Sequence, residues 1–402
     1  MSKQLGLGGA VAIGLASMIG AGVFVVFREA YAITPGGYYL AFALAALVAA
    51  LNATSVYRLA TQIDRPGGIY AYSRQLVSKP ASFLAGSAFT LGKIGSIAAI
   101  ALVFAEYLAD GSKLVAVVAI VSLTLVNLLG INRTALVAAV IASLSMLFLT
   151  ITVVSSWQVP SYIDSPHREY FLQPNLDGWH VLQAAAIFFF AFAGYARVAT
   201  LGNEVSKPKT NIPRAIAISL VVVVLLYFAI GWQLERIFGQ DLHVLQTPVA
   251  RLAELAVPWI PAVMVQLIVS VAALGSMLAL LAGVSRTVST MAEDREVPQV
   301  LSKRNRFGAP LRAELAIAIS ACALVFLPTL TWVVGVSSFC VLVYYAIGHI
   351  AALKQKQQPQ VISLLGLLLC VALVVSIDWP TALACGLVLL ALVVVRKLTY
   401  VS

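Results

Sequence analysis

The chain has 402 residues, of which 61% are hydrophobic and only 10% charged, and its mean hydropathy is +0.96. This composition excludes an ordinary soluble protein and indicates one that crosses a membrane many times. The formal net charge is +10, and because no basic and aromatic nucleic-acid module accompanies it, we interpret it as a sign of topology and of contact with anionic headgroups.

Apolar windows long enough to cross a bilayer recur along the whole chain. A hydrocarbon core of about 30 Å requires about 20 apolar residues per helix, so the sequence predicts an all-α polytopic membrane protein with about twelve transmembrane helices. The eighth span is too long for one untilted crossing, so its end is expected to project into the cytoplasm. The predicted spans are 7–30, 38–61, 81–108, 114–130, 134–157, 180–201, 213–234, 258–291, 312–328, 331–353, 360–377 and 379–396.

Lys and Arg residues are distributed unevenly between the two sides. If the N-terminus is cytoplasmic, the inner loops, the inner ends of the spans and both tails carry 19 of the 26, the outer loops and outer span ends carry 5, and Lys93 and Arg197 remain deep inside spans. Positively charged loops tend to stay in the cytoplasm. We therefore predict a multi-pass protein of the cell (plasma or inner) membrane with both termini cytoplasmic. Its first span is expected to be an uncleaved anchor, because no cleavage pattern follows it.

The first span contains an apolar run from Ile13 to Phe27 that is interrupted by Gly14, Gly20 and Gly22. Unwound backbone survives at membrane depth only where it lines a cavity or touches a ligand, so these glycines fit a broken helix. They fit close helix packing equally well, since small residues also let helices touch. From this span alone both interpretations stay open.

The region between the second and fourth predicted spans has two notable features. A Pro-Gly turn at 65–68 leads into an amphipathic stretch that is expected to lie on the cytoplasmic face. The third span then carries Lys93 about halfway along an apolar run. A buried Lys is costly unless it is paired, neutral or in a water-filled cavity, so it is a candidate functional residue. The alternative is a Lys that snorkels or forms a structural pair.

The long outer loop at 158–179 divides the chain into two similar halves. Each half would hold five crossings, and an odd number of crossings forces the halves into opposite orientations, as in an inverted repeat. We predict a first repeat at 1–157, an extracellular loop at 158–179 and a second repeat at 180–353. The last two helices and a cytoplasmic C-terminus fill 354–402.

The sixth span offers a test of the repeat, because it should be interrupted where the first span is. It runs through Phe188 to Leu201, with Gly194 in the middle and Arg197 just beyond it. Two broken helices that meet at the midplane expose free N–H groups at one kind of end and free carbonyls at the other. An amino acid carries a carboxylate and an ammonium that match those two ends.

Cysteine and histidine residues form no pattern that indicates chemistry. All four cysteines fall within apolar spans without metal-ligand spacing, so they are interpreted as small core residues. Three histidines lie in or beside outer loops, and His349 near the inner end of the tenth span is equally unspecific. We predict no metal, no cofactor and no catalytic residues. The cysteines are Cys322, Cys340, Cys370 and Cys385, and the outer histidines are His167, His180 and His243.

Four segments together resemble the amino acid–polyamine–organocation (APC) superfamily. They are S-M-I-G-A-G-V-F at 17–24, P-G-G-I-Y-A-Y at 66–72, the sixth span with its tail at 189–216, and S-R-T-V-S-T-M-A-E-D-R-E-V-P at 285–298. The similarity follows nearly the whole chain in order, and the segment that ends in N-I-P-R-A-I is its most specific part. The resemblance implies the leucine-transporter fold, a 5+5 inverted repeat with helices 1 and 6 broken and two helices appended.

The resemblance also implies a substrate site. Backbone N–H groups at Ala21 and Gly22 would meet the substrate carboxylate, and carbonyls near Met18, Phe190 and Ala193 would meet its ammonium. Gly194 marks the interruption of helix 6 in that site. Phe190 matches an aromatic gate that covers the substrate from outside, whereas the other three phenylalanines between 188 and 192 are interpreted as packing residues.

The chain departs from the family pattern at three places. Many relatives carry an acidic residue where this chain has Ala196, so a cationic substrate has no evident partner. Many proton-coupled relatives carry a Lys in helix 5, where this chain has Ser145, and the sodium-ligating hydroxyls of helix 8 fall near Leu280 and Leu281. Coupling therefore stays open, with Lys93 as a candidate that replaces the missing Lys.

We therefore predict a secondary active transporter that moves amino acids, neutral and apolar ones, by alternating access with proton coupling or exchange. Its partners would be a small amino acid, protons and the lipid bilayer, and no nucleic acid. An exporter of the same family is the alternative within this class. A channel or a membrane-bound enzyme is the alternative outside it. A channel requires a continuous pore, and an enzyme a cluster of acid, base or metal groups, whereas only Lys93 and Arg197 were identified at depth.

Overall fold

The computed structural model describes residues 5–63, 67–129, 131–161, 176–199, 205–327, 329–355 and 359–400. Within these ranges the regular elements are helices, and the only β-type pairing is an isolated bridge between Leu5 and Val205. The α-helices are α1 (Leu7–Met18), α2 (Ala21–Ile33), α3 (Tyr38–Gln62), α4 (Ile69–Leu76), α5 (Lys79–Ala109), α6 (Lys113–Asn127), α7 (Ile131–Ser155), α8 (Gly178–Phe192), α9 (Ala196–Ala199), α10 (Pro208–Phe238), α11 (Pro248–Ala256), α12 (Ala262–Glu293), α13 (Leu311–Val325), α14 (Leu330–Leu353), α15 (Gln360–Ser376) and α16 (Trp379–Tyr400).

These helices account for each of the predicted spans. Within the described ranges, eight helices are long and apolar enough to cross a membrane, and the pair α1 and α2, bent by 42° at its break, would make a ninth. The predicted spans at 114–130, 312–328 and 360–377 correspond to the shorter helices α6, α13 and α15. The prediction of a polytopic membrane protein built from helices is confirmed.

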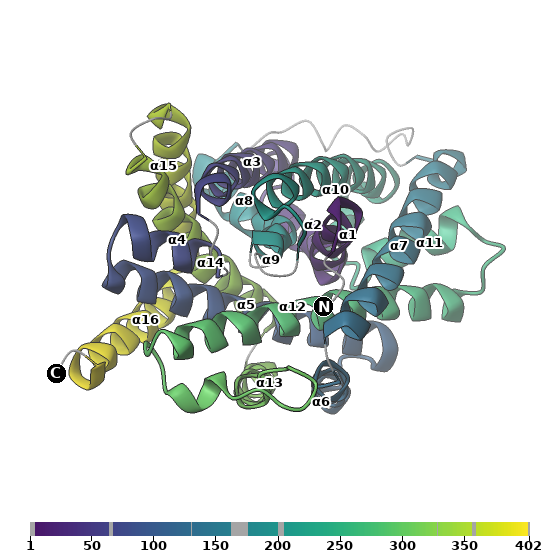
Figure 1. Ribbon diagram of the computed structural model, residues 1–402. Helices are drawn as coiled ribbons and strands as arrows, with labels where there is room; N and C mark the ends of the chain where they lie inside the picture. The colour runs from purple at the N-terminus through teal and green to yellow at the C-terminus, as the bar shows by residue number, and fades with distance from the viewer. Residues whose placement is uncertain are drawn as a thin grey trace.

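The long helix α5 occupies the middle of the helix assembly (Figure 1). It packs most extensively against α14 and α12, while α15 and α16 lie at one side of the molecule and α7 and α11 at the other. Most of the α5 side chains are buried. Because α5 is surrounded by protein, a polar side chain in its middle faces other helices, and this places Lys93 in the interior.

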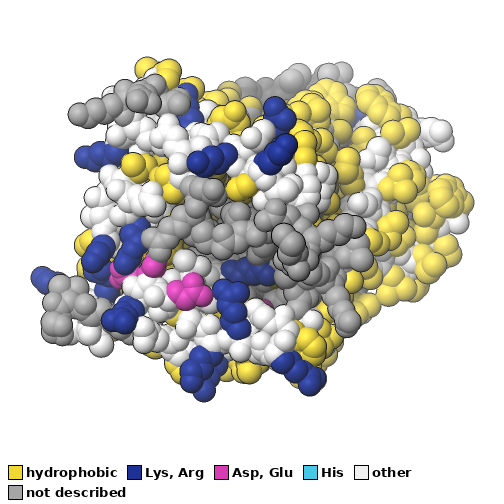
Figure 2. Space-filling view, viewed as in Figure 1, with side chains coloured by type: hydrophobic (Ala, Val, Ile, Leu, Met, Phe, Trp, Pro, Cys, Tyr) yellow, Lys and Arg dark blue, Asp and Glu magenta, His cyan; other side chains and the backbone are white. Residues whose placement is uncertain are grey.

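Helices at the rim direct apolar side chains outward. Val361 and Leu368 of α15 and Leu390 and Leu398 of α16 are each more than half exposed. Such a surface suits hydrocarbon, which needs no hydrogen bonds from it. Figure 2 shows apolar side chains gathered over one flank of the viewed face, and Lys and Arg side chains scattered over the rest of it.

The short helix α4 forms the amphipathic stretch predicted after the second span, and it packs closely against the protein. Its first five residues, 69–73, are all buried, and the Ile69 N–H donates to the Tyr344 hydroxyl at 3.0 Å. Gly67 (φ +116°) and Gly68 (φ +59°) have backbone conformations that favour glycine, and they turn the chain back onto the protein. Helix α4 therefore packs against both α5 and α14.

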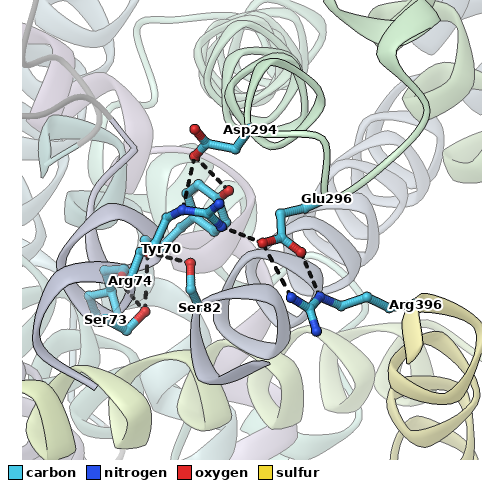
Figure 3. Close-up of polar contacts among 8 residues, drawn as sticks. Tyr70, Ser73, Arg74, Ser82, Asp294, Glu296 and Arg396 are labelled. Atoms are coloured by element: carbon cyan, nitrogen blue, oxygen red, sulfur yellow. Dashed lines mark hydrogen bonds and ion pairs between the residues drawn. The ribbon is translucent and has the colours of Figure 1, made fainter. Parts of the chain in front are cut away.

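A network of ion pairs joins α4, the end of α12 and α16 (Figure 3). Glu296 accepts hydrogen bonds from Arg74 and from Arg396, the latter at 2.5 Å between Nε and Oε2. Asp294 accepts from the Tyr70 hydroxyl at 2.8 Å and lies 3.7 Å from the Arg74 Nε. Burial by itself raises the pKa of Glu296, but the hydrogen bonds from Arg396 and Arg74 outweigh it and hold this pKa below its ordinary value.

Replacing Glu296 by glutamine is expected to lower the free energy of unfolding at neutral pH by about 1.5–3 kcal/mol, the range for hydrogen bonds to charged groups. The reason is that two guanidinium groups lose their shared carboxylate. Because the folded-state pKa of Glu296 is lowered, this contribution is fully present above the unfolded-state pKa of about 4.3 and is lost as the pH falls through the folded-state pKa. Thermal unfolding of the purified protein should show a difference in stability between wild type and variant that becomes smaller as the pH falls.

The matched control for this prediction is Glu293→Gln. The Glu293 side chain is 50% exposed, and its 3.3 Å ion pair is with Arg304, which is 61% exposed. Exposed pairs contribute little to stability. An equal loss of stability in both variants at neutral pH, or a gap for Glu296→Gln that does not change with pH, would contradict the prediction.

Candidate functional site

The break predicted in the first span lies between α1 and α2. Helix α1 ends at Met18, Ile19 and Gly20 are not helical, and α2 begins at Ala21. The first N–H groups of a helix have no partner inside it, so those of Ala21 and Gly22 are available to a ligand. The prediction of a broken helix is confirmed.

Close packing occurs at the same glycines. A Cβ atom built on Gly20 would lie 1.9 Å from the Ser276 Oγ of α12, and one built on Gly22 would lie 2.6 Å from the Ala191 Cα of α8. Real Cβ atoms do not approach other atoms so closely. The two interpretations left open by the sequence are therefore both correct, because the glycines permit the break and also let α8 and α12 approach it.

The interruption of the sixth span is milder than that of the first. Helix α8 ends at Phe192, residues Ala193–Tyr195 form a 3₁₀ turn, and the short helix α9 follows. Gly194 in this turn lies against the end of α1, since a Cβ atom on it would be 2.1 Å from the Ser17 carbonyl oxygen. The two interruptions thus lie against each other, as predicted. The first span is bent at its interruption, whereas the sixth span changes from an α-helix to a 3₁₀ turn.

A small cavity of about 20 Å³ lies where these segments meet. We call it the central cavity. It has room for about one water molecule, so this conformation is closed and an amino acid could enter only after the helices move apart. Five of the predicted residues line it, namely Met18, Gly22, Lys93, Phe190 and Gly194, together with Ser17, Ser96, Ile100, Ala191, Ser276 and Leu280.

Two carbonyls predicted to receive a substrate ammonium are occupied by side chains of the protein. The Tyr227 hydroxyl donates to the Met18 carbonyl at 2.6 Å, and the Lys93 Nζ donates to the Ala193 carbonyl at 2.9 Å. Ala193 is the C-cap of α8, where the negative end of the helix dipole favours a cation. Lys93 is only 2% exposed, so this contact is what compensates its burial.

Of the other two coupling candidates, Ser145 is not among the described residues that line this cavity. Ser145 is buried, and its hydroxyl donates to the Ile141 carbonyl of its own helix, α7, at 2.7 Å. Ala142 of the same helix packs with Ala16 and Ala279, so α7 supports α1 and α12 through small apolar residues. The side chains of Arg197 and Ala21 lie outside the described residues, so neither is placed.

Three hydroxyl groups at the site were not singled out from the sequence. Ser276 of α12 lines the central cavity one helical turn before Leu280, and that spacing of four residues could have indicated it. Ser96 of α5 shares a hydrogen bond of 2.7 Å with Ser337 of α14. The hydrogen bond from Tyr227 to the Met18 carbonyl could not be predicted from the sequence, because the two residues are 209 positions apart.

One of the four phenylalanines of α8 lies at the site and the other three do not. Phe190 is buried and lines the central cavity. Phe188 packs edge to face on Phe27, and Phe192 lies 5.5 Å from the Phe42 ring centroid. Phe189 likewise packs against Tyr345. These three are core residues.

Two buried polar groups elsewhere correct the sequence interpretation. His349 was considered unspecific, but it is fully buried and contacts the Asn52 Oδ1 at 2.6 Å and the Ser55 Oγ at 2.9 Å, which ties α14 to α3. Glu314 was not identified as a buried charge, yet it accepts a hydrogen bond from Asn127 at 2.9 Å in the first turn of α13. Neither residue lines the central cavity.

Comparisons with known proteins agree with this architecture. The family model for amino acid permeases matches residues 5–397. The chain is 39% identical to an uncharacterized transporter of Mycobacterium tuberculosis, over 97% of this chain and 89% of that protein. It is 23% identical to cationic amino acid transporter 5 of Arabidopsis thaliana (93% and 69% covered) and 24% identical to a branched-chain amino acid permease of Bacillus subtilis (95% and 89% covered).

Proposed function

The chain belongs to the amino acid permease family, whose model matches nearly its whole length, and from this premise we propose that it moves neutral, apolar amino acids across the cell membrane by alternating access. It is a membrane transporter and not an enzyme. The observation that carries the proposal is the central cavity, where the start of α2 and the end of α8 meet. The N–H groups at the start of α2 suit a carboxylate, and the end of α8, where the Ala193 carbonyl already holds the Lys93 ammonium, suits an ammonium, so the two together match a zwitterion.

The walls of the central cavity support an apolar side chain on the substrate. Ile100, Phe190 and Leu280 supply apolar surface, and no carboxylate is among the described residues that line it. A substrate with a cationic side chain would meet the Lys93 ammonium without a compensating charge, which is unfavourable in a site of low dielectric. The name of the Bacillus relative fits this choice and the name of the Arabidopsis relative does not.

Binding of an amino acid would change the contacts of Lys93. The substrate ammonium and the Lys93 Nζ compete for the same carbonyl, that of Ala193. Two cations side by side in a cavity repel each other, so Lys93 would have to move away or release a proton. This competition supports a coupling role for Lys93, with protons as the coupled ion.

The topology of the proposed transporter has the termini in the cytoplasm, as the distribution of Lys and Arg predicts. The basic residues on the face shown in Figure 2 support that orientation. Residues 1–157 and 180–353 would form the two inverted repeats, and their relative movement would open the central cavity to one side or the other. The two last helices, α15 and α16, lie at one side of this assembly.

A thermal-shift screen of the purified protein over the twenty amino acids tests the substrate class. Leucine, isoleucine, valine, methionine and phenylalanine are expected to raise the melting temperature. A ligand at 100 times its Kd stabilises the folded state by about 2.7 kcal/mol. N-acetyl-leucine, which lacks the ammonium, is the control and should have no effect. Preferential stabilisation by arginine, lysine or glutamate would overturn the proposed class.

A further inference from the structure

A second pocket, with a volume of about 300 Å³, lies at the far end of the helices from the Arg74–Glu296–Arg396 network. We call it the outer pocket. Asp378 borders the outer pocket just before α16 begins, whereas Arg396 of the network is near the end of the same 22-residue helix. An α-helix rises roughly 1.5 Å per residue, so most of the length of α16 separates the pocket from the network. The volume is at the lower end of the range for small-molecule sites, about 300–1,000 Å³.

The polar groups of the outer pocket can accept hydrogen bonds from a cation. Asp378 is exposed, and within the described residues its side chain accepts hydrogen bonds from the Thr381 N–H at 3.1 Å and the Thr381 hydroxyl at 2.6 Å, both at Oδ2. Among these residues no donor contacts Oδ1, which can therefore serve a ligand. Gln183, Thr329 and Thr331 are further polar residues of the lining, and among the described residues that line the pocket there is no Lys or Arg.

Ser338 gives an independent indication of a ligand. Its side chain is 1% exposed, it lines the outer pocket, and its Oγ has no hydrogen-bond partner among the described residues. A buried polar group without a partner costs about 1–3 kcal/mol, so such groups normally have a partner in the functioning protein. Ile33, Ile187 and Trp332 complete the pocket with apolar surface that suits an alkyl chain.

The outer pocket lies next to the central cavity. Ala186 and Ile187 of α8 line the outer pocket, and Phe190, one helical turn further along the same face, lines the central cavity. On α14, Ser338 is among the residues that line the outer pocket, and its neighbour Ser337 shares a hydrogen bond with Ser96 of the central cavity wall. The outer pocket and the central cavity are thus separated by one helical turn along α8, and on α14 they involve the adjacent residues Ser338 and Ser337.

We propose that the outer pocket is a binding site for a primary ammonium group on an alkyl chain, held by Asp378 and Ser338. In the transporter it receives the ammonium end of an amino acid before that amino acid passes Phe190. This natural role rests on the proposed function. Recognition of the ammonium does not, because it needs only the carboxylate, the hydroxyl and the apolar wall.

The test uses radiolabelled 3-methylbutylamine, which has an ammonium and a branched alkyl chain but no carboxylate, and the purified full-length protein. The wild type is expected to bind this amine saturably, and Asp378→Asn is expected to weaken binding at least tenfold. Asn is as good a helix N-cap as Asp, so the Thr381 contacts and the start of α16 are retained. Ser338→Ala, which removes the buried hydroxyl without adding volume, should also weaken binding.

The matched control is Asp177→Asn. Asp177 is also an N-cap, which accepts from the Trp179 N–H at 2.9 Å, and it does not line the outer pocket. This variant should bind the amine like the wild type. Absence of saturable amine binding by the wild type, or unchanged affinity in both Asp378→Asn and Ser338→Ala, would overturn the proposal. Leucine uptake without amine binding would refute the outer site alone, whereas amine binding without amino acid transport would refute the proposed function alone.

Discussion

Replacing Lys93 by methionine or alanine is expected to abolish uptake driven by a pH gradient in proteoliposomes, while counterflow exchange of the same amino acid stays measurable. Lys93 is buried in the middle of α5 and its ammonium is bound to the Ala193 carbonyl beside the central cavity. Methionine is similar in length but carries no proton, so it can fill the space without taking part in coupling. Exchange needs only the substrate site and the movement of the helices.

Lys113→Met is the matched control for this experiment. Lys113 also donates to a carbonyl, that of Phe326 at 3.4 Å, but it is exposed at the start of α6. Uptake driven by the pH gradient should persist in this variant. If the wild type itself does not respond to a pH gradient, or if both Lys93 variants keep the response, the proton role of Lys93 is wrong. Loss of exchange as well would assign Lys93 to the substrate site or to the fold.

Replacing Gly194 by alanine is expected to abolish amino acid uptake and to lower the melting temperature of the purified protein. The added methyl group would lie 2.1 Å from the Ser17 carbonyl oxygen and 2.4 Å from its carbon. These are backbone atoms and cannot rotate away, so the end of α1 must shift relative to α8. Overpacking of this kind typically costs about 1–3 kcal/mol, and here it moves the two interruptions that form the central cavity.

Gly8→Ala is the control for Gly194→Ala. Gly8 is on α1, and nothing lies within 4 Å of a Cβ atom built on it, so its replacement should leave uptake and melting temperature unchanged. Equal behaviour of the two variants would show that the close approach of α1 and the 3₁₀ turn is not required. Gly22→Leu, which would block the carboxylate site that the family resemblance implies, is less informative, because the new side chain would also collide with Ala191 of α8.

Much of the architecture was predictable because it depends on local sequence. Apolar length determines which segments cross the membrane, so the spans from the first to the last could be located from hydropathy alone. The clustered glycines marked the place of the break between Met18 and Ala21, because glycine lowers the cost of unwinding and of close approach, but they fitted close packing equally well, and the family resemblance was needed to imply a broken helix. The interruption at Gly194 could be located in the same way.

What the sequence by itself determined, therefore, is where the helices are, where two of them are interrupted, and which family the motifs resemble. Only the tertiary structure decided how the polar groups are paired. Lys93 could be recognised as a buried cation, but its partner is a carbonyl 100 positions away, and His349 is joined to Asn52 across 297 positions. The physical reason is that a buried polar group is stabilised by whichever group the packing of helices brings near it. That choice depends on the relative placement of elements distant in the chain, and no local pattern of residues encodes it.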